Sequence, residues 1–234
     1  MKKFISMILL VAMITLATVS CSKDDGGSST DTSNITSGIF VLNEGNWGAN
    51  DSELTYYNTV SGETSENVFF NANGKQLGDT ANDILICGSK MYIAVSSSAI
   101  IFVTDLKGKI IKEIKVAGAS ANLSPRQLTS ANGNVYASFM EGYVGKIDTT
   151  DFSVSTVAVG PMPEGIAYAN NKIYVANSDG YNPAYGNTVS IIDAKTFTVT
   201  KTIEVAINPQ NLYLSSGYLY LVCWGNYADK PAAL

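Results

Sequence analysis

Aromatic and amide side chains are the groups in this chain best suited to binding a ligand, and they gather in three long segments rich in Gly and Asn. The segments run over residues 44–51, 177–187 and 224–229. Aromatic rings and amides displayed on loops combine apolar contact with hydrogen bonding, and they are typical of a recognition surface. The loop residues expected to contact a ligand are Asn46, Trp47, Tyr181, Tyr185, Trp224 and Tyr227.

A second set of polar residues stands at the start of short apolar runs. Asn82, Arg126 and Glu164 occupy this position in three different runs. If the runs are the innermost strands of a ring of sheets, the three side chains face the mouth of the central channel. Two plainer roles stay open: loop aromatics can cap the ends of a sheet core, and polar residues at strand starts can bind channel water alone.

The composition argues against catalysis. The chain contains no histidine, which removes the commonest general base, the commonest metal ligand and the Ser-His-Asp class of hydrolase. Cys87 and Cys223 stand alone in different segments, so we expect small buried hydrophobic residues rather than metal ligands or a disulfide. A formal net charge of −5 is a poor match for nucleic acid, which is bound by clustered Lys and Arg. We therefore expect no catalytic residue, no metal site and no resident cofactor.

The elements that must position these residues belong to a repeat of four short segments, whose clearest copy runs over residues 163–205. The segments are rich in Val, Ile, Tyr and Thr and alternate with period two, and Gly, Asn and Ser punctuate them. Two anchor residues recur at intervals of about 40 to 45 residues, a spacing typical of propeller blades. The pattern predicts an all-β fold, a β-propeller of four-stranded antiparallel blades, with the anchor tyrosines in its core. The anchors are Tyr92, Tyr136, Tyr174 and Tyr220, and Asp105, Asp148 and Asp193.

The connections between the expected strands are unequal in length. The first-to-second and third-to-fourth turns are short and polar, so one rim of the propeller is expected to hold plain hairpins. The second-to-third loops and the crossovers between blades emerge on the opposite rim. That rim is expected to carry both sets of candidate binding residues.

The expected propeller occupies residues 38–234. The segment 38–46 aligns with 172–180, so the folded part is expected to open on the second strand of a blade. The count is then three strands, three complete blades and two further strands, or about four to five blades. A ring of four blades with one strand left over is an alternative. We favour an incomplete propeller that forms part of a larger ring, because an open ring leaves sheet edges and apolar faces uncovered.

The N-terminal residues have the pattern of an export signal. Lys2 and Lys3 precede an apolar run, and small residues lead to Cys21, which predicts a signal peptide over residues 1–20. The cysteine resembles the acylated residue of a bacterial lipobox, so Cys21 is expected to carry the lipid anchor. Residues 21–37 are rich in Gly, Ser, Thr and Asp, which predicts a flexible tether. An ordinary cleaved signal with an incidental cysteine is the alternative.

The repeats resemble a known group of propellers. The run Ile173-Tyr-Val-Ala-Asn and the opening Pro163-Glu-Gly-Ile are similar to the signature of YVTN/YncE-type β-propellers. The first expected blade, from Gly38 onward, resembles the opening of Bacteroidetes surface lipoproteins that include the BtuG-type cobalamin-binding proteins. The start at Cys21-Ser-Lys-Asp-Asp resembles the surface-export signal of such lipoproteins.

This resemblance implies a seven-bladed ring displayed on the outer membrane at the cell surface, anchored only through lipid. It implies that the protein captures cobalamin as bound cargo and passes the corrinoid to a TonB-dependent outer-membrane transporter. Two other functions stay open. One is a surface-layer or adhesive propeller that binds protein or glycan, and the other is a propeller enzyme whose catalytic residues lie outside this chain.

Overall fold

The computed structural model describes residues 37–234. The expected signal peptide, the lipidation site at Cys21 and all but the last residue of the expected tether lie outside the described residues. Within the described part, no helix is long and apolar enough to cross a membrane.

The described chain folds into five antiparallel sheets in which consecutive strands are neighbours. The first sheet contains β1 (Gly38–Asn43), β2 (Glu53–Asn58) and β3 (Thr64–Ser65). The second contains β4 (Ala81–Cys87), β5 (Lys90–Val95), β6 (Ile100–Asp105) and β7 (Ile110–Ile114). The third contains β8 (Pro125–Ala131), β9 (Asn134–Phe139), β10 (Tyr143–Asp148) and β11 (Val154–Ala158). The fourth contains β12 (Pro163–Ala169), β13 (Lys172–Asn177), β14 (Thr188–Asp193) and β15 (Thr198–Glu204), and the fifth β16 (Pro209–Ser215) and β17 (Tyr218–Cys223).

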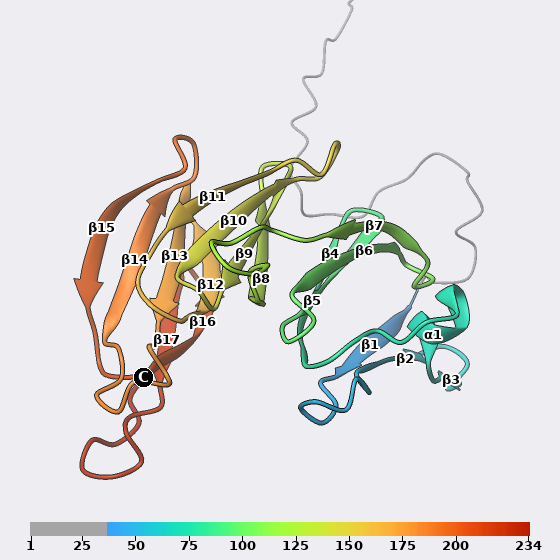
Figure 1. Ribbon diagram of the computed structural model, residues 1–234, viewed down its shortest axis with the longest axis horizontal. Coiled ribbons are helices and arrows are strands. Elements are labelled where there is room, and N and C mark those ends of the chain that lie inside the picture. The colour runs from blue at the N-terminus through green and yellow to red at the C-terminus, as the bar shows by residue number, and fades with distance from the viewer. Residues whose placement is uncertain (1–36) are drawn as a thin grey trace, which may run out of the picture.

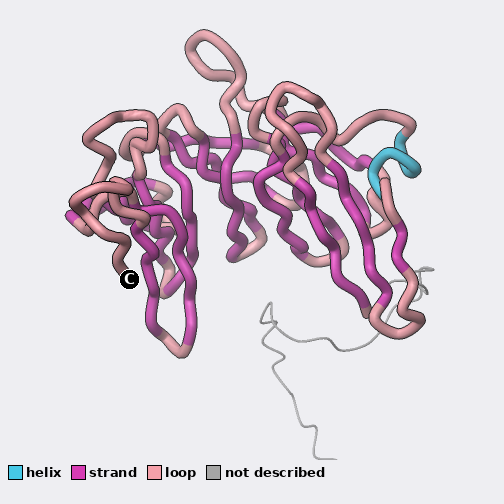
Figure 2. The backbone as a smooth tube through the Cα atoms, turned by 90° about the horizontal axis from the view of Figure 1, so that it is seen from below, coloured by secondary structure: helices cyan, strands magenta, loops and turns pink. Residues whose placement is uncertain are grey.

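The sheets stand beside one another along an arc, with their first strands toward the inside (Figures 1 and 2). The inner strands β4, β8, β12 and β16 contact one another in sequence. This is the blade arrangement of a β-propeller, and it confirms the predicted all-β fold of four-stranded antiparallel blades. The strand count of three, four, four, four and two also matches the count expected from the repeat.

Apolar side chains fill the space between neighbouring sheets, because alternate residues of each strand point to opposite faces. Tyr92 belongs to the core between the second and third sheets, and Tyr136 to the core between the third and fourth. Both are buried, as predicted, and Tyr174 is half-buried. The prediction is wrong for Tyr220, which is 42% exposed because no sheet formed by residues 37–234 covers its face of β17.

The recurring aspartates build the hairpin rim. Asp105 Oδ1 accepts hydrogen bonds from the backbone N–H groups of Lys107 and Lys109. Asp193 Oδ1 accepts from those of Lys195 and Thr196 in the same way. A carboxylate that bonds the backbone a few residues onward stabilises a tight turn, so the aspartate anchors of the repeat are turn residues.

Among the described residues, one helix interrupts the all-β pattern. Helix α1 (Val68–Asn73) connects the first sheet to the second. The ring of Phe69 in this helix packs on the ring of Phe102, with 4.8 Å between the centroids. The sequence shows no sustained helical stripe here because six residues make fewer than two turns.

The buried hydroxyl of Tyr92 gives a first test of this core. Tyr92 Oη has no hydrogen-bond partner among the described residues, and burial raises the pKa of Tyr92 to about 12. We expect Tyr92→Phe to leave the free energy of unfolding unchanged or to raise it by about 1 kcal/mol, because an unsatisfied buried group is removed. Tyr168→Phe is the matched control. Its hydroxyl bonds Asn132 and Asn171, so we expect a loss of about 1 kcal/mol in chemical denaturation.

The contact between the inner strands gives a second test. A Cβ atom on Gly165 in β12 would lie 2.5 Å from the carbonyl oxygen of Gln210 and 3.0 Å from the backbone nitrogen of Leu212 in β16. We therefore expect Gly165→Ala to lower the stability by about 1–3 kcal/mol, because backbone must move apart. Gln127→Ala, at the corresponding position of β8, should have little effect. Equal melting temperatures for the two variants would contradict this interpretation.

Candidate ligand-binding rim

The strand registers place the long loops and the starts of the inner strands on one rim. Asn177 pairs with Pro163 at the start of β12 and with Thr188 at the start of β14. In the first two sheets, the backbone N–H of Ser52 donates to Gly78 O across 3.1 Å. The loop after β17 joins the same rim, because Trp224 N donates to Asn208 O. We call this end of the molecule the loop rim.

Each inner strand begins with a break in register. The pairing shifts between Ala81 and Asp83 in β4, and a shift occurs near the start of β8, β12 and β16 as well. A β-bulge redirects the side chains around it and is frequent beside functional sites. The side chains affected include Asn82, Arg126 and Glu164, which the sequence singled out.

Hydrogen bonds join these three residues across neighbouring sheets. Arg126 Nε donates to Glu164 Oε2 at 2.8 Å, and Arg126 Nη1 donates to Asn82 Oδ1 at 2.9 Å. Asn82 Nδ2 in turn donates to Glu44 Oε1 at 3.1 Å. We call Glu44, Asn82, Arg126 and Glu164 the rim ladder. It runs across the first four sheets of the arc.

The buried Ser138 and the half-buried Asp83 hold the backbone beneath the ladder. Ser138, in β9, accepts a bond from Gln127 N at 3.0 Å and donates to Glu164 O at 2.6 Å. Asp83 Oδ2 accepts from Leu128 N at 2.7 Å, which ties β4 to β8. These bonds satisfy backbone groups that the bulges leave outside the regular ladders. The position of the ladder side chains is therefore fixed from below.

The charges on the ladder do not balance. Burial raises the pKa of Glu164, and the Arg126 guanidinium opposes part of that rise. Burial also raises the pKa of Asp83, while backbone N–H groups of Leu128 and Ile84 oppose it. The rim ladder itself contains two carboxylates, Glu44 and Glu164, and one guanidinium, Arg126. Neutral polar groups of a ligand, which need no counter-charge, suit this surface better than anionic groups.

The loop aromatics lie on the same rim but are not joined to the ladder. Trp47, Tyr181 and Tyr227 are 84%, 80% and 73% exposed, so they do not cap the sheet core. Trp224 is also exposed, whereas Tyr185 is half-buried. Asn46 bonds Asp51 within its own loop, through its side chain at 2.9 Å and its backbone N–H at 2.7 Å.

The structure thus joins Asn82, Arg126 and Glu164 directly, and leaves the aromatic residues on three separate loops. It adds Glu44, which the sequence reasoning did not select as a binding residue. Glu44 follows β1, and only its contact with Asn82 identifies it. A signal was available in principle, since Glu44 stands one residue after the end of a strand.

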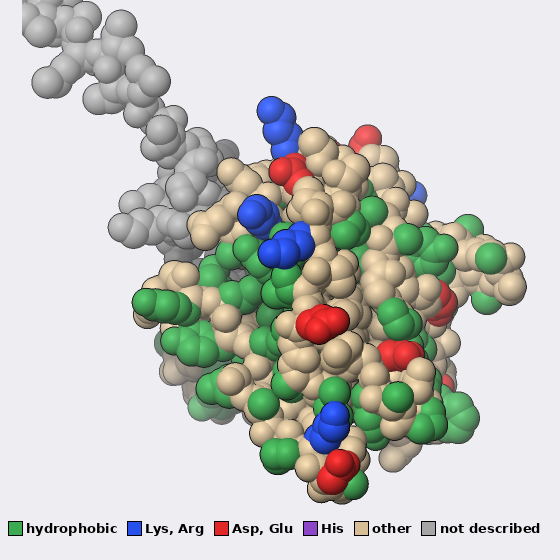
Figure 3. Space-filling view, turned by 90° about the vertical axis from the view of Figure 1, so that its left-hand side faces the viewer, with side chains coloured by type: hydrophobic (Ala, Val, Ile, Leu, Met, Phe, Trp, Pro, Cys, Tyr) green, Lys and Arg blue, Asp and Glu red, His purple; other side chains and the backbone are tan. Residues whose placement is uncertain are grey.

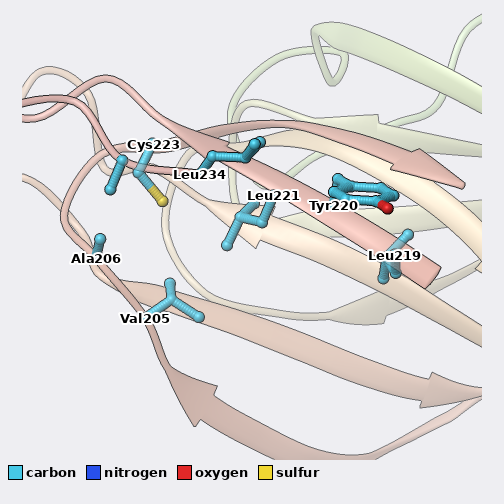
Figure 4. A pocket seen from close by; sticks show the side chains of 8 residues that line it. Val205, Ala206, Leu219, Tyr220, Leu221, Cys223 and Leu234 are labelled. Carbon is cyan, nitrogen blue, oxygen red and sulfur yellow. The ribbon is translucent and has the colours of Figure 1, made fainter.

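An apolar groove lies beside β17, next to the rim. It has a volume of about 560 Å³, and Figure 4 shows Val205, Leu219, Leu221 and Cys223 around it. No charged side chain lines this groove. Cys223 is buried here, as expected, whereas Cys87 is only partly buried. In the described part of the chain, no three His, Cys, Asp or Glu side chains are grouped to hold a metal ion.

The raised pKa of Glu164 gives a test of the ladder. A carboxyl whose pKa is higher in the folded state binds its proton more tightly there, so the folded state loses stability as pH rises above the ordinary pKa of 4.5. We expect wild type to lose stability relative to Glu164→Gln as pH rises from this value, because only wild type must ionise a buried group. Urea denaturation at a series of pH values measures this difference. A difference that stays constant up to neutral pH would contradict it.

Comparisons with known proteins support the architecture. The chain resembles hydrazine synthase of Kuenenia stuttgartiensis with a TM-score of 0.58 at 16% identity, covering 73% of this chain and 49% of that one. It resembles a chain of the mitotic checkpoint complex with a TM-score of 0.58 at 12% identity, and the match covers 80% of this chain and 54% of that one. The WD40 β-propeller domain of Doa1 matches with a TM-score of 0.55 at 16% identity, and the match covers 72% of this chain and 53% of that one. The chain spans about half the length of these three proteins, and the low identities show the fold alone.

No curated protein matches the sequence. The family model described as "Domain of unknown function (DUF5074)" matches residues 37–221. Because this match spans most of the chain, the protein belongs to the DUF5074 family.

Proposed function

We propose that this protein is a cell-surface lipoprotein that captures cobalamin on the loop rim of its propeller and passes it to a TonB-dependent outer-membrane transporter. The observation that carries the proposal is the rim ladder, a hydrogen-bonded row of polar side chains on bulged inner strands. In this proposal the protein binds its cargo without covalent chemistry and is not an enzyme.

The chemistry of the ladder supports an amide-bearing ligand. A corrinoid carries carboxamides around the edge of its ring, and each amide offers a donor and an acceptor. Asn82 offers the same pair of groups, and the Arg126 guanidinium has further N–H donors besides the two bonded to Glu164 and Asn82. The excess of carboxylate over guanidinium is compatible with a ligand edge that bears neutral amides.

The loop aromatics support contact with a large, partly apolar ligand. Trp47, Tyr181 and Tyr227 each expose most of the side chain to solvent. Exposed rings of this size are costly to leave in water, and they gain by covering a flat ligand surface. Asn46, Tyr185 and Trp224 complete the proposed contact set, with Asn46 held in place by Asp51.

Localisation follows from the N-terminal sequence. We propose that Cys21 carries the lipid anchor on the outer membrane, and that residues 21–37 let the propeller reach the transporter. The loop rim would face the transporter during transfer, since the cargo must leave from the rim where it binds.

A second candidate is a surface-layer or adhesive propeller that binds glycan or protein. The observation that favours it is the wide spread of the exposed aromatics. Trp47 and Tyr181 stand on loops from different sheets, and separate aromatic platforms suit the repeated sugars of a glycan chain. This second hypothesis places the ligand on the same loop rim but does not require the rim ladder to contact it.

Isothermal titration with cyanocobalamin tests the first proposal. We expect binding at micromolar concentration, and we expect Trp47→Ala and Tyr181→Ala each to weaken it about three- to tenfold, the effect of losing one aromatic contact. Val60→Ala is the matched control, since Val60 is 79% exposed but lies on the hairpin rim. Absence of heat with the wild-type protein would remove cobalamin as the ligand. Binding to surface polysaccharides in the same assay would then favour the second candidate.

A further inference from the structure

One residue breaks the repeat just before the inner strands. The first residue of each inner strand pairs with the last residue of the next strand, and these first residues are Ala81, Pro125, Pro163 and Pro209. Two positions earlier the chain has an apolar residue in three of the four connections, namely Leu123, Pro161 and Ile207. The connection between the first and second sheets has Asp79 there. A carboxylate at this position is therefore not needed to build the crossover between sheets.

Asp79 bonds the loop that carries Trp47. Its Oδ2 accepts a hydrogen bond from the backbone N–H of Gly48 at 2.9 Å, although 31 residues separate the two in the chain. Asp105 and Asp193, on the hairpin rim, bond backbone groups only two to four residues onward. Asp79 thus does not stabilise its own turn. It joins the crossover to the long loop of the preceding sheet.

The backbone around Trp47 is bonded on both sides of the ring. Asn46, which precedes Trp47, bonds Asp51 through its backbone N–H and its side chain. Gly48, which follows Trp47, bonds Asp79. A ring whose backbone is already fixed loses less conformational freedom when it contacts a ligand, and this favours binding.

The loop that carries Tyr181 lacks a bond of this kind in the part of the chain that the structure describes. Asn182, which follows Tyr181, bonds Asp179 in its own loop, through its backbone N–H at 2.8 Å and its side chain at 3.0 Å. The next crossover has Ile207 at the position of Asp79, and an aliphatic side chain cannot accept a hydrogen bond. The two aromatic loops therefore differ in how firmly the following crossover holds them.

The second oxygen of Asp79 shows that this residue does little for the fold. Asp79 Oδ1 is buried and has no hydrogen-bond partner among the described residues. By contrast, Asp and Glu side chains on the side where β15 lies can be seen at the surface, where water solvates them (Figure 3). A buried carboxylate oxygen without a partner lowers stability. Local features that oppose stability are expected at functional sites.

We propose that Asp79 is a positioning residue for ligand binding on the loop rim, and that it acts by holding Trp47 in place through Gly48. The inference rests on the proposed function in one respect, which is that Trp47 contacts the ligand. Asp79 does not contact the ligand itself. The loop that it holds begins with Glu44 of the rim ladder, so the Trp47 ring and the ladder form one preordered surface.

Time-resolved fluorescence anisotropy of Trp47 tests this role without a ligand. The chain has two tryptophans, so Trp224→Phe leaves Trp47 as the single tryptophan of a parent protein. We expect the anisotropy of the parent to decay with the tumbling of the whole molecule. Asp79→Ala should add a faster component from loop motion. Asp79→Asn should behave as the parent does, because its amide oxygen can accept the same bond from Gly48.

Two controls accompany the anisotropy measurement. Asp179→Ala removes a carboxylate from the other aromatic loop, and it should leave the anisotropy of Trp47 unchanged. Circular dichroism checks that each variant is folded. Asp79→Leu, which introduces the residue type found at Leu123, replaces Asp79→Ala if that variant does not fold. An identical decay in the parent and in these variants would overturn the proposal, whether or not the protein binds cobalamin.

Titration with cyanocobalamin tests the consequence for binding. We expect Asp79→Ala to weaken binding about three- to tenfold, as Trp47→Ala does, and to add nothing in the Trp47→Ala background. An equal loss in both backgrounds would overturn the proposal, because Asp79 would then act independently of Trp47. Absence of heat with the wild-type protein would instead remove cobalamin as the ligand, and the anisotropy result alone would then decide whether Asp79 positions Trp47.

Discussion

The packing of each sheet against the next is the interaction on which the rest of this structure depends. A strand that buries one face against a neighbour has apolar residues at alternate positions. Strands β5, β9 and β13 have apolar residues on both faces, because each lies between two sheets. The inner strands approach so closely that Gly165 leaves no room for a Cβ atom beside β16. Burial of Tyr92 and Tyr136, the arc of inner strands and the single rim of loops all follow from this arrangement.

The candidate site is a consequence of the same packing. Inner strands of neighbouring sheets lie close enough for side chains at their starts to meet, and the bulges turn those side chains toward one another. Arg126 bridges Asn82 and Glu164 although 44 and 38 residues separate the partners in the chain. Ser138 and Asp83 satisfy the backbone beneath them. The polar row is therefore rigid, while the aromatic rings above it stand on loops, which is a usual division between scaffold and recognition.

The fold was largely predictable, and the site only in part. Blade periodicity gave the order of strands, the short hairpins and the long loops, because each of these is recorded in local composition. Asn82, Arg126 and Glu164 could be placed on one rim by counting strands. The loop that begins with Glu44 could be placed there as well, but the bond between Glu44 and Asn82 could not, since it depends on the geometry of two sheets. Tyr220 was assigned to the core because it matches Tyr92, but burial depends on a neighbouring sheet and not on the residue itself.

The sequence by itself determined the blade, its turns and the side on which the loops emerge, since alternation, turn residues and repeat length are local properties of the chain. The aspartates that close the third strands are an example, because each bonds backbone a few residues away. Only the tertiary structure decided which polar side chains meet and which apolar faces a neighbouring sheet covers. Those outcomes depend on bulge register and on the curvature of the arc, which bring together residues that have no regular spacing in the sequence.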